Sequence, residues 1–114
     1  MLRDFLFTTL TALPVQAADL WCMPDTICRN GKCHATTDTE SSVRLHDPDG
    51  KAPVLRADAE DIPMTKTHNG AVVQWEGVND FGLRKVLAVQ ASDYVYVTRH
   101  PVGDDTASGH REVQ

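Results

Sequence analysis

The chain has 114 residues, of which 41% are hydrophobic, and it carries a formal net charge of −5 at pH 7. This length supports one domain with a modest core, which a disulfide would help to stabilise. The acidic balance argues against nucleic acid and anionic membrane surfaces as partners, because both bind clustered Lys and Arg side chains.

The chain begins with the pattern of an export signal, which we place at residues 1–17. Arg3 lies in a short charged start, and the apolar run at 5–15 is too short to cross a bilayer. Small side chains then predict cleavage between Ala17 and Ala18. The alternative is a buried N-terminal helix of a cytosolic protein. Cleavage leaves no apolar stretch of spanning length, so we expect a mature chain that is periplasmic or secreted and free of the membrane.

Three cysteines follow, at positions 22, 28 and 33. Asn30-Gly31 is the preferred pair for a two-residue type I′ hairpin turn, because both residues tolerate positive φ. Such a turn places Cys28 opposite Cys33 on adjacent strands, within reach of a disulfide. We therefore predict the pair Cys28–Cys33. The pairings Cys22–Cys28 and Cys22–Cys33 stay open at this point.

The predicted pairing leaves Cys22 without a disulfide partner among the three cysteines. It is expected as a free thiol, as an intermolecular bridge in a disulfide-linked dimer, or as a cysteine whose partner lies beyond Gln114. A zinc site that combines the three cysteines with His34 is disfavoured, because the spacings lack a C-x2-C pair and adjacent residues point to opposite faces of a strand. Covalent haem attachment is excluded because C-x-x-C-H is absent. We predict no metal and no cofactor.

From residue 41 onward, short apolar runs are broken by turn residues and no helical period is sustained. This spacing is typical of an all-β antiparallel meander that curls into a small barrel or sandwich of about seven or eight strands. We assign residues 18–40 to a cysteine-bearing hairpin segment and 41–114 to the β domain, which together form a single domain. The body strands are expected at Ser42–His46, Pro53–Ala57, Ile62–Lys66, Ala71–Glu76, Leu83–Gln90, Tyr94–His100 and Gly109–Val113.

No catalytic motif is found in the body of the chain. It lacks a Gly-x-Ser-x-Gly elbow and a glycine-rich phosphate loop, and its five histidines form no i, i+2 or i, i+4 pair. The segment 47–50 (Asp-Pro-Asp-Gly) is interpreted as a turn, because Leu45 and Arg56 stand where a calcium loop needs oxygen ligands. Trp75 and the tyrosines at 94 and 96 are interpreted as core residues rather than a glycan platform. We expect a protein that is not an enzyme.

An early cysteine, a β-meander and a Trp-bearing strand (Val72-Val-Gln-Trp-Glu-Gly77), together with export, resemble the plan of the small periplasmic C-type lysozyme inhibitors. That family carries a Ser-Gly-x-x-Tyr loop and closes with a C-terminal cysteine. Here Ser108-Gly109 is followed by no tyrosine and the final cysteine is missing, so no inhibitory residue is carried over. The chain also resembles short exported proteins of alphaproteobacteria, which indicates a compartment and no activity.

These observations predict a non-enzymatic periplasmic binding or interaction module whose partner is an unidentified protein or glycan. The alternative is an inhibitor of a cell-wall hydrolase or protease that presents Val102–Gly109, which we expect to be the longest loop of the body. A third hypothesis is a redox or metal-handling protein that uses Cys22 and His34. It requires Cys22 to be reactive in the folded state.

Overall fold

The computed structural model describes residues 19–36, 42–57 and 59–113, and these residues form ten β-strands and no helix. The predicted all-β antiparallel fold is confirmed. The predicted signal at 1–17 lies outside the described residues. None of the described residues forms a helix that could span a lipid bilayer. The strands are β2 (Leu20–Arg29), β3 (Lys32–Ala35), β4 (Val43–His46), β5 (Val54–Ala57), β6 (Glu60–Pro63), β7 (Thr65–Asn69), β8 (Val72–Val78), β9 (Arg84–Gln90), β10 (Asp93–His100) and β11 (Gly103–Val113).

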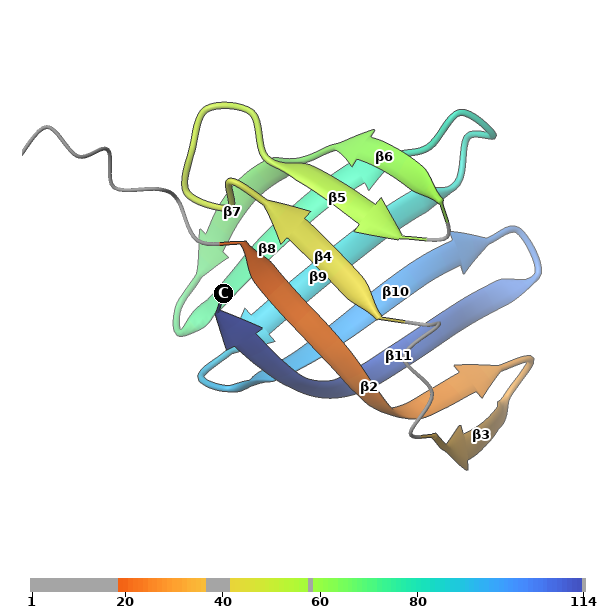
Figure 1. The fold of residues 1–114 in the computed structure, drawn as a ribbon. Coiled ribbons are helices and arrows are strands. Elements are labelled where there is room, and N and C mark those ends of the chain that lie inside the picture. The colour runs from red at the N-terminus through yellow and green to blue at the C-terminus, as the bar shows by residue number, and fades with distance from the viewer. Residues whose placement is uncertain (1–18, 37–41, 58, 114) are drawn as a thin grey trace, which may run out of the picture.

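All of the strands belong to one curled sheet (Figure 1). Their order in space is β6-β5-β4-β2-β11-β10-β9-β8-β7, and β3 pairs with the end of β2. The first described strand therefore lies beside the last, with Cys22 facing Arg111. The strongly β-prone segment of β10 lies near the middle of this order, as its composition predicts.

The two edges of the sheet meet where β6 runs directly into β7. β6 pairs with β5, whereas β7 pairs with β8, and only Met64 separates the two strands. Gly77 of β8 packs against this junction: a Cβ atom added there would lie 2.4 Å from the Pro63 carbonyl oxygen and 2.6 Å from the Met64 sulfur. Because the glycine allows such a close approach, the sheet curls into a nearly closed barrel.

Alternate side chains of each strand point into the barrel and form its core. The predicted burial of three aromatic residues is confirmed, since Trp75, Tyr94 and Tyr96 are 4%, 2% and 7% exposed. The large aliphatic core side chains come from β2, β4, β5, β6 and β9, and they are Leu20, Ile27, Val43, Leu45, Leu55, Ile62, Leu87 and Val89.

The expected loop at Val102–Gly109 is wrong, because β11 begins at Gly103 and the turn before it consists of Pro101 and Val102. Asp104 and Asp105 of β11 lie opposite Arg99 and Thr98 of β10, respectively. These two residues of low intrinsic β propensity are thus held in a strand by pairing with β10, whereas β2 pairs with β11 only from Thr106 onward. The expected strand Ile62–Lys66 is likewise divided between β6 and β7.

The connections between strands gather at two ends of the barrel (Figure 1). We call the end that carries the β2–β3 hairpin and the β8–β9 and β10–β11 turns the hairpin end. The opposite end, with the β4–β5 loop and the β9–β10 turn, is called the loop end. The β4–β5 loop is held to the core there, because Trp75 Nε1 donates to the Pro48 carbonyl oxygen at 3.0 Å and Lys66 pairs with Asp49.

Candidate functional site

A cavity of about 260 Å³ opens at the hairpin end of the barrel. Its wall is assembled from β2, β9, β10 and β11 and from the residues at the start of β4 and the end of β5. The volume lies just below the ~300–1,000 Å³ of pockets that hold drug-sized ligands, so the cavity suits a small molecule. The apolar part of the wall consists of Ile27, Val43, Ala57, Leu83 and Ala107.

Lys85 of β9 lies in this wall and is the one charged residue that is buried among the described residues, at 5% exposure. Its Nζ donates to Thr98 Oγ1 at 3.0 Å and lies 5.7 Å from the centroid of the Tyr96 ring. No ion pair joins Lys85 to a carboxylate within the described part of the chain. The wall therefore contains a buried ammonium group that has a hydroxyl partner but no counter-ion among the residues that the structure describes.

The register of β9 explains why this lysine points inward. Lys85 shares the inward face of β9 with Leu87 and Val89, and it lies directly opposite Thr98 of β10. The sequence pattern held one signal for the site, namely a charged residue that interrupts the apolar set of Leu83, Leu87 and Val89. Our sequence reasoning did not interpret this interruption as part of a binding site.

The charges on the cavity wall differ in sign from the overall charge of the protein. Lys85 and Arg29 supply two cationic side chains, and Asp105 is the one carboxylate among the described lining residues. The Asp105 carboxylate already interacts with His100, at 3.1 Å between Oδ2 and Nε2. A net positive wall in a chain of net charge −5 attracts an anion to this end of the barrel.

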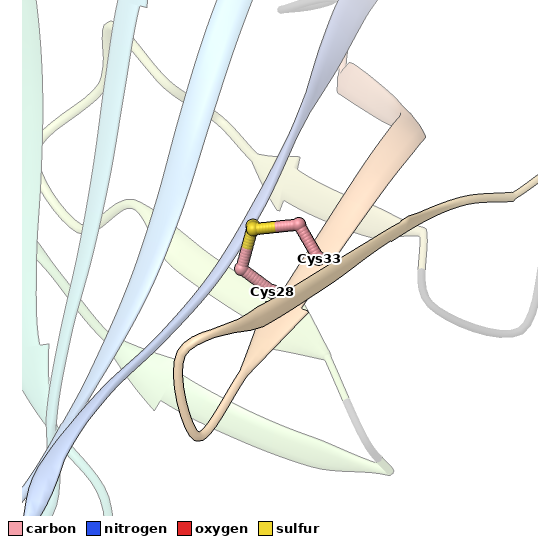
Figure 2. Close-up of a disulfide and its surroundings, with 2 residues drawn as sticks. All are labelled: Cys28 and Cys33. Atoms are coloured by element: carbon pink, nitrogen blue, oxygen red, sulfur yellow. A yellow bond between two sulfur atoms is a disulfide. The ribbon is translucent and has the colours of Figure 1, made fainter.

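Cys28 and Cys33 form a disulfide that joins β2 to β3 (Figure 2). They face each other in the register that the hairpin predicts. Asn30 and Gly31 have φ values of 52° and 76°, as a type I′ turn requires. The bridge fixes the hairpin beside Arg29, which lines the cavity.

Cys22 lies in the core as a free thiol with 0% exposure. Burial raises the pKa of this thiol to about 12, and the nearby Arg111 opposes the rise without cancelling it. Of the alternatives drawn from the sequence, this placement corresponds to the free thiol. A disulfide-linked dimer through Cys22 would require β2 to leave the core, and it stays a prediction.

The structure does not bring the other candidate ligands together. His34 is exposed on β3, whereas Cys22 is buried in the core. Within residues 19–36, 42–57 and 59–113, no group of three His, Cys, Asp or Glu side chains is placed to hold a metal ion. The segment 47–50 forms a turn, in which Gly50 N donates to the Asp47 carbonyl oxygen at 3.1 Å.

A second polar cluster lies at the loop end, where Asp19 joins the start of β2 to β4. Its carboxylate accepts hydrogen bonds from Arg44 Nε at 2.7 Å and from His46 Nδ1 at 2.9 Å. Burial favours a higher pKa for Asp19, but the bonds from Arg44 and His46 outweigh it and hold the pKa below its ordinary value. All three side chains have partners, so the cluster serves the fold and leaves no site for a ligand.

Comparisons with protein-family models, with curated proteins and with solved structures give no match for this chain. The cavity and the side chains that line it are therefore the features from which a function can be inferred.

Proposed function

We propose that this protein is a non-enzymatic binding protein that acts outside the cytoplasm and holds a small molecule in the cavity at the hairpin end. The observation that carries this proposal is the open cavity itself, which combines apolar side chains with the few inward polar groups that fix a ligand's orientation. Ends of small barrels are common places for such sites.

The surroundings of the cavity favour binding without a large rearrangement. Strand pairing holds the inward side chains of β9, β10 and β11 in register, and the disulfide fixes the hairpin beside them. At the loop end, Trp75 and Lys66 hold the β4–β5 loop against the barrel through a hydrogen bond and an ion pair. The cavity instead opens at the hairpin end. A rigid site loses little conformational entropy when a ligand binds.

Two observations support export. The Cys28–Cys33 bridge suits an oxidising compartment, where disulfides form and persist. The sequence of residues 1–17 has the pattern of a cleaved signal. The test is the intact mass of protein expressed with its own N-terminus in bacteria. A chain that starts at Ala18 and contains one disulfide supports export, whereas an uncleaved chain with three free thiols overturns it.

Ligand binding is tested by recording amide spectra of the oxidised protein with a library of small fragments. We expect shift changes in residues that line the cavity, such as Leu83 and Thr98. Ala107→Leu fills the cavity from β11 and is expected to abolish them. Ala88→Leu adds the same atoms to β9 at a position whose side chain points away from the core, and it is expected to leave binding intact. Binding that survives Ala107→Leu would overturn the proposal.

One observation favours a second candidate, an inhibitor of a hydrolase. The β8–β9 turn presents Phe81 at 81% exposure. The turn is rigid, because Asn79 Oδ1 accepts from the backbone N–H groups of Phe81 and Leu83, at 3.0 and 2.9 Å. A lysozyme turbidity assay tests this role. Protection that is lost in Phe81→Ser would support it, and no protection by the wild-type protein would remove lysozyme as the target.

A further inference from the structure

We infer that the ligand of the hairpin-end cavity is a small carboxylate, whose charged group binds the Lys85 ammonium and whose short apolar body packs against the wall. This inference rests on the proposed function, and it names the chemical class of the ligand. Three observations support it: Lys85 has no counter-ion among the described residues, the described wall carries an excess of positive charge, and the remaining space is small and partly apolar.

A buried charge is costly unless a partner of opposite charge compensates for its lost hydration. Lys85 is only 5% exposed, and its Nζ interacts with the Thr98 hydroxyl and with the Tyr96 ring. An ammonium has three N–H donors, of which one hydroxyl satisfies only one. A carboxylate in the cavity would accept from the remaining donors and supply the counter-charge.

Lys66 of β7 provides a comparison for Lys85, because it is also a lysine that lies beside an aromatic ring. Its Nζ also lies 5.7 Å from an aromatic centroid, that of Trp75, and it is partly buried in β7. Unlike Lys85, Lys66 pairs with a carboxylate of the protein, that of Asp49. Each lysine thus has an aromatic neighbour, but Lys85 has no carboxylate partner among the described residues, and we assign that place to the ligand.

The rest of the wall selects for an anion of limited size. Arg29 adds a second positive charge, and the Asp105 carboxylate is occupied by His100, so repulsion of a bound anion is weakened. Ile27, Val43 and Leu83 provide the apolar surface for the body of the ligand. A volume of about 260 Å³ admits a benzoate-sized molecule and excludes long acyl chains.

The experiment compares benzoate and hexanoate with their neutral amides, benzamide and hexanamide, by amide-shift titration of the oxidised mature protein. Charge-assisted hydrogen bonds contribute ~1.5–3 kcal/mol, so we expect each carboxylate to bind about 10- to 100-fold more tightly than its amide. Lys85→Met keeps most of the length of the side chain and removes its charge, and it is expected to abolish that preference. Lys66→Met is the matched control and is expected to preserve it.

The outcomes separate this inference from the proposed function. Equal binding of acids and amides in the cavity overturns the carboxylate assignment, whereas the binding role stands. A preference for acids that persists in Lys85→Met also overturns it. If no carboxylate and no library fragment binds at the hairpin end, the proposed function fails with it. Thr98→Val removes the hydroxyl partner and keeps the lysine, and it is expected to retain the preference. It is a control for local disturbance of the wall, which could otherwise explain a loss of the preference in Lys85→Met.

Discussion

The Trp75 indole N–H donates to the carbonyl oxygen of Pro48 at 3.0 Å, which joins two residues 27 positions apart and closes the loop end of the barrel. Trp75 also lies under Lys66, so one side chain holds both the β4–β5 loop and its ion pair with Asp49. Trp75→Phe removes the hydrogen bond and part of the buried ring. We expect it to lower the free energy of unfolding by about 1–3 kcal/mol, as measured by denaturant titration.

The same substitution should loosen the β4–β5 loop selectively. The Gly50 amide is protected by its bond to the Asp47 carbonyl oxygen, and its hydrogen exchange is expected to accelerate in Trp75→Phe. Trp21→Phe is the matched control, because Trp21 is half-buried and lies against Arg44 rather than the loop. Equal acceleration at Gly50 in both variants would contradict the role given to Trp75.

The parts of the fold that sequence could predict are those set by local chemistry. Asn30 and Gly31 adopt positive φ in a two-residue turn, and this alone determines that Cys28 faces Cys33. Alternation along β8 likewise predicted the burial of Trp75. Both depend on the conformational preferences of a few consecutive residues.

The parts that sequence could not predict depend on pairing between distant strands. Asp104 and Asp105 have the composition of a loop, yet contacts with β10 place them in a strand. The cavity exists only because the sheet curls and brings β2, β5 and β9 around one end. Its single local signal is Lys85, and the lack of a counter-ion among the described residues is visible only when the neighbouring side chains are in place.

Tyr94 provides a test of the core that differs from an ordinary truncation. Its hydroxyl is buried and has no hydrogen-bond partner among the described residues. Burial raises the pKa of the phenol, and Cys22 and Asp25 raise it further. Tyr94→Phe removes an unsatisfied polar group, so we expect the free energy of unfolding to stay the same or to rise by up to about 1–3 kcal/mol.

The control at this position is Tyr94→Leu, which removes much of the ring as well as the hydroxyl. We expect it to destabilise the protein because it leaves a cavity next to Cys22. Thermal and denaturant unfolding of both variants provide the measurement. A clear loss of stability in Tyr94→Phe would mean that the hydroxyl does have a bonding partner in solution.

Asp19 gives the protein a pH-dependent contribution to stability. Its folded-state pKa lies below the ordinary value of 3.8, because the bonds from Arg44 and His46 outweigh the effect of burial. A carboxyl group with a lowered folded-state pKa stabilises the fold above its unfolded pKa, and this contribution is lost as the pH falls through the folded pKa. We expect Asp19→Asn to be less stable than the wild type at neutral pH.

The difference between wild type and Asp19→Asn should narrow as the pH falls below 3.8, when measured by denaturant unfolding across that range. Asp80→Asn changes an exposed carboxylate in the β8–β9 turn and serves as the control. Its stability relative to the wild type is expected to vary little with pH. A constant Asp19→Asn difference down to the lowest pH would show that the Arg44 and His46 bonds do not depend on the charge of Asp19.

Cys22 is the one free thiol of the described residues, and its reactivity is set by burial in β2. With a pKa of about 12 and no exposed surface, it is a protonated thiol at neutral pH and has no access to a reagent. We expect iodoacetamide to leave the native oxidised protein unmodified and to add one group after unfolding in denaturant. Mass spectrometry distinguishes these states. Rapid labelling of the native protein would instead indicate that β2 opens, which is the condition that a disulfide-linked dimer or a redox role for Cys22 requires.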